Sequence, residues 1–233
     1  MDENERQRLL AQYSEIATLA GGLAHEIRNP LSTMSLNLEL LIEEVEGSDN
    51  PRDMRMLKKL QKVQQEAEQL NELLNDFLQF ARVGDQELVA EDLNTLVREF
   101  VDFYRPTAQE HDIEVSLHLE SNLPHVKLNE SLLRQVLLNL AQNARQAMPE
   151  GGHLELQTSV RDGEVQLEFI DTGEGMSEKT LTKIFQVFYS TKSDGSGLGL
   201  PTVRKIVEAH DGTISCESEP GRGTRFLISL PPA

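Results

Sequence analysis

The chain has 233 residues, of which 38% are hydrophobic and 26% charged, a composition typical of a folded protein. Its formal net charge is -17, and the sequence contains no block of basic residues. Both features argue against direct binding to a nucleic-acid backbone or an anionic membrane. No stretch approaches the roughly 18 apolar residues of a membrane span. The polar start is not a secretory signal, and the single cysteine, Cys216, excludes an internal disulfide. We therefore expect a cytoplasmic protein.

The first third of the chain predicts two long helices joined by a turn. Asn50 precedes Pro51 in the segment GSDNP, and both residues disfavour continuation of a helix. In the second helix, apolar residues recur at alternating intervals of four and three, which is a heptad pattern. They are Met56, Leu60, Val63, Ala67, Leu70, Leu74 and Phe77.

The first helix shows the same spacing from Tyr13 to Ile27 and is then disturbed at Pro30. A hairpin of two such helices exposes a long apolar seam, which a second copy would bury in a four-helix bundle. We therefore predict a homodimer. The alternative is a hairpin that packs against the second domain of its own chain.

The segment GGLAHEIRNPLST lies in the first helix and contains His25 followed by Glu26. With Leu23 and Ile27 on the seam, His25 falls at the heptad position farthest from it and should face solvent. Asn29 lies one turn further along the same face. The register disfavours a buried histidine and leaves two interpretations, an ordinary surface histidine or a reactive one. An HExxH zinc site is disfavoured because Asn29 occupies the second histidine position.

From residue 92 onward, helices and strands alternate irregularly. The spacing predicts helices at 92–110, 130–147, 177–184 and 197–210, and strands at 112–119, 125–128, 153–160, 164–170, 212–217 and 224–230. The Asp-Gly pair in VRDGEV predicts a hairpin turn between two of these strands. Mainly hairpin-linked strands mixed with helices indicate a two-layer α+β sandwich, with the helices on one face of one sheet.

Two polar motifs of this region suggest a nucleotide. Asn139 and Asn143 in NLAQNARQAM share one helix face, where their amide oxygens could converge on a hard cation, although helix asparagines are also often merely exposed. In FIDTGEGM, a strand runs into Asp171, followed by Gly173 and Gly175. This carboxylate could accept a hydrogen bond from an adenine amino group, and the glycines would let backbone approach a flat ring. An ordinary turn after a strand is the simpler interpretation.

Two glycine-rich motifs follow. In STKSDGSGLGL, Gly195, Gly197 and Gly199 precede an amphipathic helix, an arrangement that suits a polyphosphate. Lys192 could reach a terminal phosphate or be an ordinary loop lysine. The stretch is neither a P-loop nor a convincing dinucleotide fingerprint, because it lacks Gly-Lys-Ser/Thr and a preceding parallel strand. GRGTRF, at 221–226, is a glycine turn into the last strand.

The segments AHEIRNPLS, NLAQNA, DTGEGM, IFQVFYSTKSDGSGLGL and GRGTRF, in this order and spacing, resemble the sensor histidine kinases of two-component systems. The resemblance covers roughly residues 18 to 231, and the wording FYSTKSDGSGLGLP is most similar to the nitrogen-regulation type. It implies a signal-transmitting helix or linker at 1–17, a dimerisation and histidine phosphotransfer domain at 18–84, and a catalytic ATP-binding domain at 90–233. The second half also resembles the wider ATPase superfamily of gyrase, heat-shock chaperones and mismatch-repair ATPases.

The resemblance also implies residue roles. His25 would accept a phosphoryl group from ATP, with Glu26 as general base. Asn143, with Asn139 in the same motif, would bind Mg²⁺, and Asp171 would bind adenine. The other nucleotide-binding positions would be Gly173, Gly175, Lys192, Gly195, Gly197, Gly199 and Thr224.

Asn29 matches the family position associated with dephosphorylating the partner, where an amide could orient a water. The resemblance therefore implies a kinase that passes the phosphoryl group from its histidine to an aspartate in the receiver domain of a response regulator. It also implies a phosphatase activity that removes the phosphoryl group from that regulator. No sensor domain precedes residue 18, so we expect the signal to arrive from a sensor outside this sequence. Gln146 stands where many members carry a basic residue, with Arg145 beside it. Phosphate charge would then rest more on Mg²⁺ and Lys192.

Two other function classes stay open at this point. A chaperone- or topoisomerase-like ATPase, which couples hydrolysis to clamp closure, would explain the nucleotide motifs but leave the helical hairpin and AHEIRNP without a role. A degenerate, non-catalytic scaffold would keep the dimeric fold without enzymatic activity. The intact motifs argue against this class.

Overall fold

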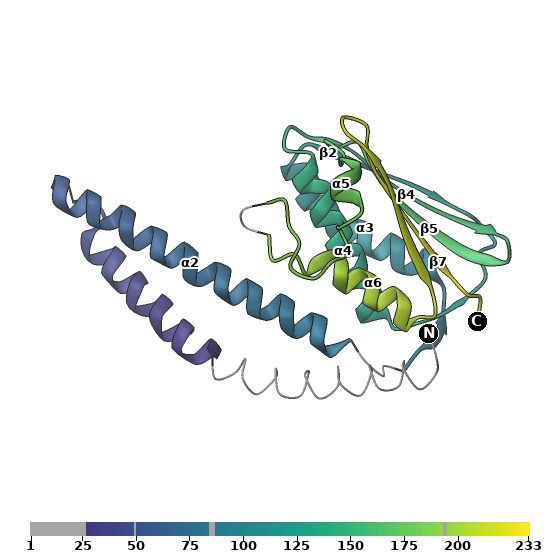
Figure 1. Ribbon diagram of the computed structural model, residues 1–233, viewed down its shortest axis with the longest axis horizontal. Coiled ribbons are helices and arrows are strands. Elements are labelled where there is room, and N and C mark those ends of the chain that lie inside the picture. The colour runs from purple at the N-terminus through teal and green to yellow at the C-terminus, as the bar shows by residue number, and fades with distance from the viewer. Residues whose placement is uncertain (1–26, 49, 84–86, 193–194) are drawn as a thin grey trace. The chain divides into compact units, whose positions relative to one another are not determined.

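The computed structural model describes residues 27–48, 50–83, 87–192 and 195–233 (Figure 1). The chain divides into two compact units at residue 84, except that the short segment Lys192–Ser196 groups with the first unit. His25 and Glu26 lie outside the described residues, as does the expected linker at 1–17. No helix in the described ranges is long and apolar enough to cross a bilayer.

The first unit contains a helical hairpin, as the sequence predicts. Residues 27–45 are helical, and α2 (Pro51–Arg82) follows a short turn. Asn50 caps α2, because its side-chain oxygen accepts a hydrogen bond from the Arg52 amide at 3.0 Å, and Pro51 occupies the first helical position. Between the two helices, the Arg28 guanidinium donates to the Asn75 side-chain oxygen at 2.7 Å.

The heptad seam of α2 is covered unevenly within one chain. Ala67 is buried, but Met56, Val63 and Leu70 are 41%, 54% and 53% exposed. At the end of the helix, Leu78 and Ala81 are buried in a small apolar cluster with Leu74 and Phe77. One chain therefore leaves large apolar side chains of the seam in contact with solvent.

The second unit confirms the predicted α+β order. Its helices are α3 (Leu93–Glu110), α4 (Glu130–Ala147), α5 (Glu178–Leu181) and α6 (Gly199–Ala209). Its strands are β1 (Val89–Glu91), β2 (Ile113–Leu119), β3 (Val126–Leu128), β4 (Gly152–Arg161), β5 (Glu164–Asp171), β6 (Thr213–Glu219) and β7 (Gly223–Leu230). The sequence pattern did not predict β1, and α5 is shorter than the helix expected at 177–184.

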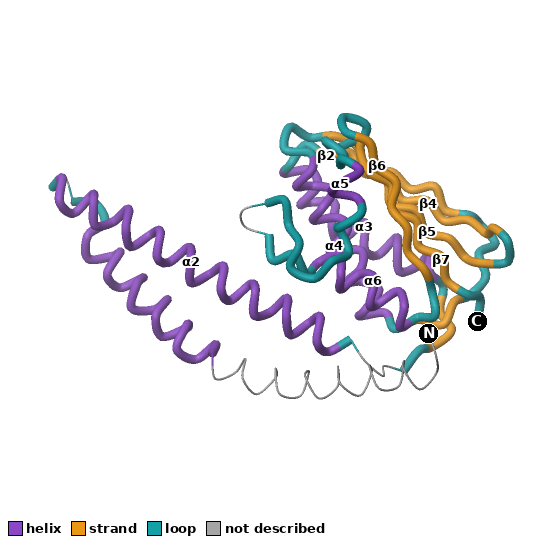
Figure 2. Tube along the Cα trace, in the orientation of Figure 1, coloured by secondary structure: helices purple, strands orange, loops and turns teal. Residues whose placement is uncertain are grey.

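The main sheet has the strand order β2-β4-β5-β7-β6. Its strands are drawn in orange in Figure 2. The β2–β4 pair is parallel and the other three pairs are antiparallel, whereas β1 pairs with β3 in a separate two-stranded sheet. Every second residue of the central strands is buried on one face, among them Leu156, Leu167 and Ile228. The helices cover that face, which gives the predicted two layers (Figure 1).

A buried polar cluster joins α3 to the sheet. The Asn94 side chain donates to the Glu120 carbonyl oxygen at 2.8 Å and accepts from the Thr158 hydroxyl at 2.7 Å. Asn94 and Thr158 are both buried. Because each polar atom has a partner, the cluster fixes α3 against β4 without leaving unsatisfied groups.

Candidate functional site

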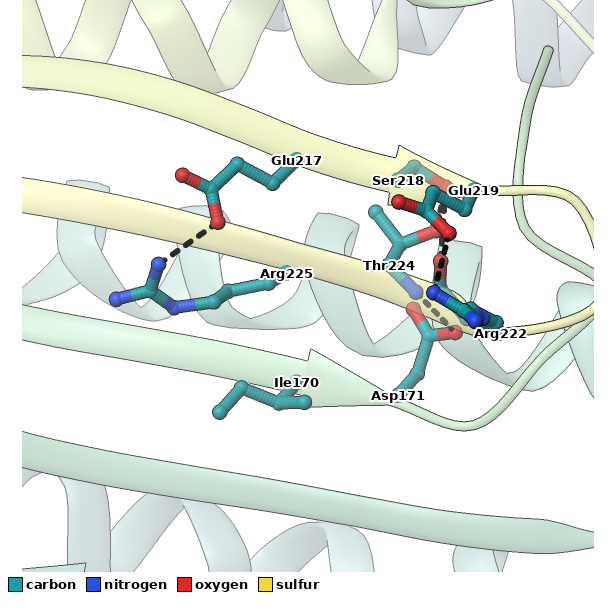
Figure 3. Close-up of a pocket in the computed structure, with 9 residues that line it drawn as sticks. Ile170, Asp171, Glu217, Ser218, Glu219, Arg222, Thr224 and Arg225 are labelled. Carbon is teal, nitrogen blue, oxygen red and sulfur yellow. Dashed lines mark hydrogen bonds and ion pairs between the residues drawn. The ribbon is translucent and has the colours of Figure 1, made fainter.

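The end of β5 holds Asp171 in one fixed orientation. Its Oδ1 accepts hydrogen bonds from the Gly173 amide at 2.9 Å and the Thr224 amide at 3.2 Å. Thr224 is the pairing partner of Asp171 in the β5–β7 ladder, and both side chains are buried. The structure therefore brings together Asp171 and Thr224, two predicted site residues that are far apart in the sequence (Figure 3).

Close backbone packing requires the glycines around Asp171. Gly175 has a φ of +66°, and a Cβ there would lie 2.0 Å from the Glu219 carbonyl oxygen. A Cβ on Gly173 would lie 2.7 Å from the Ala147 Cβ at the end of α4. The DTGEGM loop is thus held between α4 and the β6–β7 hairpin, so packing of the loop alone already demands both glycines.

Ser218 is a site residue that the sequence interpretation missed. Its hydroxyl accepts a hydrogen bond from the Met176 amide at 2.9 Å and donates to the Gly223 carbonyl at 2.8 Å, and it lies 3.1 Å from the Thr224 hydroxyl. Ser218 therefore links the loop after Asp171 to both strands of the final hairpin. Its place in the alternating strand TISCESE was the available signal, since that pattern puts it on the inner face with Cys216.

Cys216 is half-buried on β6. Burial, and then the negative charges of Asp171 and Glu217, raise the pKa of the Cys216 thiol to about 12. The thiol therefore stays protonated at neutral pH, and a nucleophilic role for it is disfavoured.

A cavity of about 250 Å³ lies at the ends of β5, β6 and β7 (Figure 3). It is lined by Ile170, Asp171, Glu217, Ser218, Glu219, Arg222, Gly223, Thr224 and Arg225. Arg225 is paired with Glu168 at 2.7 Å and with Glu217 at 2.9 Å, and these carboxylates raise its pKa. Of the described residues that were predicted to bind nucleotide, Asp171 and Thr224 line this cavity and the others do not.

The two asparagines of α4 have different surroundings. Both are half-buried, and the Asn139 amide nitrogen donates to the Gly199 carbonyl oxygen at 3.3 Å. The Asn143 side chain makes no hydrogen bond to any other residue in the part of the chain that the structure describes. Arg145 is directed toward His111, with 3.0 Å between its guanidinium and the imidazole Nε2.

The glycine-rich segment before α6 contains two kinds of glycine. Gly197 has a φ of +66°, a Cβ there would lie 2.5 Å from the Phe188 carbonyl carbon, and its carbonyl accepts from the Phe188 amide at 3.0 Å. A Cβ on Gly199 would meet no described atom within 4 Å, so packing does not require glycine there. Lys192 and Gly195 are exposed and belong to the segment that groups with the first unit, so their roles stay predictions.

The donor set fits a nucleotide phosphate better than a metal held by protein alone. Within the described ranges, no side-chain hydrogen bond caps the N-terminus of α6, an end at which backbone N–H groups and the helix dipole favour an anion. Among the described residues, no three or more His, Cys, Asp or Glu side chains could hold a metal ion together. A Mg²⁺ ion at Asn143 would therefore need phosphate oxygens and waters as its other ligands, which this ion commonly uses.

In the first unit, Asn29 is exposed on the first helix. The Thr33 hydroxyl donates to the Asn29 carbonyl at 3.1 Å, and the preceding residue, Arg28, is bonded to α2. This position leaves the Asn29 amide at the helix surface.

Two family models match the chain. One, described as a histidine kinase-, DNA gyrase B- and HSP90-like ATPase, matches residues 128–233, and the other, the His Kinase A phospho-acceptor domain, matches residues 15–86. These matches define a phosphoacceptor helical hairpin followed by an ATPase-type α+β domain. The chain belongs to the sensor histidine kinases and contains the core of that family.

Individual relatives agree with this assignment. Sporulation kinase D of Bacillus subtilis (strain 168) is 33% identical over 230 residues, which cover 98% of this chain and 44% of that protein. The solved structure of full-length ShkA in complex with AMPPNP is 32% identical with a TM-score of 0.70, over 93% of this chain and 46% of that one. The chain spans about half the length of the curated relatives it matches.

One further structure supports the fold alone. Histidine kinase ThkA in complex with response regulator protein TrrA is 21% identical with a TM-score of 0.68, over 100% of this chain and 68% of that one.

Proposed function

We propose that this chain transfers the γ-phosphoryl group of ATP to His25 and then to an aspartate in the receiver domain of a response regulator. The observation that carries the proposal is the Asp171 carboxylate, fixed by the Gly173 and Thr224 amides in the same chain as a phosphoacceptor hairpin. The ShkA complex with AMPPNP supports the nucleotide, and the match to the phospho-acceptor domain supports the response regulator as partner.

The chemistry needs little activation of the nucleophile. A histidine is largely neutral near pH 7, so one imidazole nitrogen can attack the γ-phosphorus of ATP directly. The new N–P bond forms as the bond from phosphorus to the oxygen of the leaving ADP breaks, and Glu26 takes the imidazole proton. Catalysis then rests mainly on positioning and charge neutralisation. Mg²⁺, held by Asn143 and the phosphates, would neutralise phosphate charge.

Incubation with γ-labelled ATP and Mg²⁺ tests the kinase proposal. The protein should acquire an acid-labile, alkali-stable label, and His25→Ala should abolish it because the acceptor nitrogen is lost. His118→Ala, which removes an exposed histidine from β2, is the matched control and should keep the label. Release of free phosphate without labelling of the protein would instead favour the clamp-type ATPase.

We also propose that the chain dephosphorylates its response regulator through Asn29. The amide lies at the surface of the phosphoacceptor helix, where it could orient a water toward the phosphoaspartate. Asn29→Ala should lose phosphatase activity and retain labelling by ATP. Asn37→Ala, an exposed asparagine two turns further along the same helix, is the control. Slower autophosphorylation with intact phosphatase activity in Asn29→Ala would contradict this role.

We further propose that the chain acts as a homodimer. The support is the exposed half of the heptad seam, with Met56, Val63 and Leu70 each more than a third exposed in one chain. Pairing two hairpins would bury these side chains in a four-helix bundle.

A further inference from the structure

Helices α4 and α6 pack against each other, and each carries part of the proposed nucleotide site. Asn143 lies on α4, whereas α6 begins at Gly199, where backbone N–H groups point out of the helix. The distance between these two features depends on how α6 is placed along α4. Two side-chain hydrogen bonds connect α6 to α4 and its N-cap residue, one at each end of α6.

The first bond lies at the C-terminal end of α6. His210 follows this helix and is only 1% exposed. Its Nδ1 lies 2.7 Å from the Ile206 carbonyl oxygen, which can only accept, so Nδ1 carries the proton. Its Nε2 accepts a hydrogen bond from the Asn129 amide at 2.9 Å and is therefore unprotonated. The imidazole is neutral, and Asn129 in turn caps α4 through the Leu132 amide at 3.1 Å.

The second bond lies at the N-terminal end of α6. There the Asn139 side chain donates to the Gly199 carbonyl oxygen at 3.3 Å. From Asn129 to Asn139, α4 advances about 15 Å, and the 11 residues of α6 advance about 16 Å. The two helices are therefore antiparallel and bonded over matching lengths, so that α6 is tied to α4 at both ends.

The family motif implies that Asn139 helps to bind Mg²⁺, but in this structure its side chain bonds to the Gly199 carbonyl oxygen. Its amide nitrogen is turned to the first carbonyl of α6, whereas Asn143, one turn along the same helix, has no side-chain bond to a described residue. A Cβ on Gly199 would meet no described atom of another element within 4 Å. A shift of α6 along α4 would therefore move the N–H groups at this helix start relative to the Asn143 amide.

We propose that Asn139 and His210 are positioning residues that hold the N-terminus of α6 in register with Asn143 for the phosphates of ATP, and that Asn139 is not a cation ligand. The inference rests on the proposed function, since it concerns the same nucleotide site. His210 acts through α6 and touches neither nucleotide nor metal.

Calorimetric titration of the full chain with Mg-ATP tests the His210 end. His210→Phe removes the acceptor for the Asn129 amide and should weaken binding by about threefold to thirtyfold, a range typical of coupling through packed elements. His210→Gln keeps an acceptor and should recover most of the affinity. The control is Asn94→Leu, which disrupts the buried cluster between α3 and β4 and so lowers stability away from α4 and α6.

The outcomes separate the possible roles of His210. If His210→Phe lowers the melting temperature as Asn94→Leu does and both bind Mg-ATP like the wild type, His210 is merely structural and the proposal is overturned. If the wild-type chain itself does not bind Mg-ATP, the proposed function fails, and with it the premise of this inference.

Titration with ATP in Mg²⁺ and in EDTA tests the Asn139 end. Asn139→Ala should weaken binding by a similar factor in both conditions, because the position of α6 affects the phosphates whether or not the ion is present. Asn143→Ala is the comparison and should reduce the gain in affinity that Mg²⁺ provides. An Asn139→Ala variant that loses only this Mg²⁺-dependent gain, or that binds like the wild type, would contradict the positioning role.

Discussion

At the scale of single residues, the site depends on close backbone contacts around Asp171. Thr224 and Gly223 both belong to the strand that meets this carboxylate, and the glycine approaches the Asp171 main chain directly. The motif DTGEGM identifies the aspartate from sequence. It does not reveal Ser218 or His210, whose partners Met176 and Asn129 are 42 and 81 residues away. Only the tertiary fold creates those contacts.

Two glycines of the β6–β7 hairpin provide a matched stability test. Gly221 and Gly223 have φ values of +75° and +91°, but a Cβ on Gly221 meets open space and one on Gly223 would lie 1.9 Å from the Asp171 carbonyl oxygen. Gly221→Ala should cost about 1–2 kcal/mol of unfolding free energy through the left-handed backbone alone. Gly223→Ala should cost clearly more, because Asp171 must also move. Urea unfolding of both variants measures the difference, and equal losses would refute the close contact.

At the scale of elements, local pattern predicts most of the fold. The heptad spacing predicts the long helices, the Asn50-Pro51 pair the turn between them, and the Asp-Gly pair the β4–β5 hairpin. The three-residue strand β1 was not predicted, because its pairing with β3 defines it as a strand and no local pattern does. The parallel pairing of β2 with β4 could not be predicted either, since two strands separated by a helix carry no local signal of their pairing.

The link between α4 and α6 predicts an acid-sensitive contribution to stability. Burial lowers the pKa of His210 below its ordinary value of 6.5. The unfolded chain therefore binds a proton at this histidine at a higher pH than the folded chain does. The free energy of unfolding should thus fall as the pH drops below about 6.5 toward the folded pKa. Urea unfolding across this pH range measures the slope.

The matching variants identify the group responsible for that slope. His210→Gln cannot titrate and should lose part of the acid dependence. Asn94→Leu lowers stability but removes no titratable group, so it should keep the wild-type slope. An unchanged slope in His210→Gln would show that the imidazole is not the group that titrates.

At the scale of the whole molecule, a phosphoacceptor hairpin and an ATPase-type domain lie in one chain. Five ordered motifs predict this combination through their resemblance to the sensor histidine kinases, since chance would very rarely assemble them in this order. The domain limits at 18–84 and 90–233 stay predictions, as does a cytoplasmic location.

The seam of α2 predicts the assembly. Val63→Glu places a charge on an apolar position that is 54% exposed in one chain and should convert the dimer to monomer, because the charge would be buried at the interface. Lys62→Glu, at the neighbouring exposed position of the same helix, changes the charge more and should remain dimeric. Sedimentation velocity distinguishes the two states. A wild-type chain that sediments as a monomer would contradict the dimer.

Mapping the phosphorylated residue by mass spectrometry after incubation with Mg-ATP tests the kinase proposal most directly. We predict a phosphoryl group on the imidazole of His25, and none in Asp171→Asn, because that change alters the carboxylate expected to bind adenine. A phosphoryl group on another residue, or unchanged phosphorylation of His25 in Asp171→Asn, would contradict the proposed transfer from this nucleotide site.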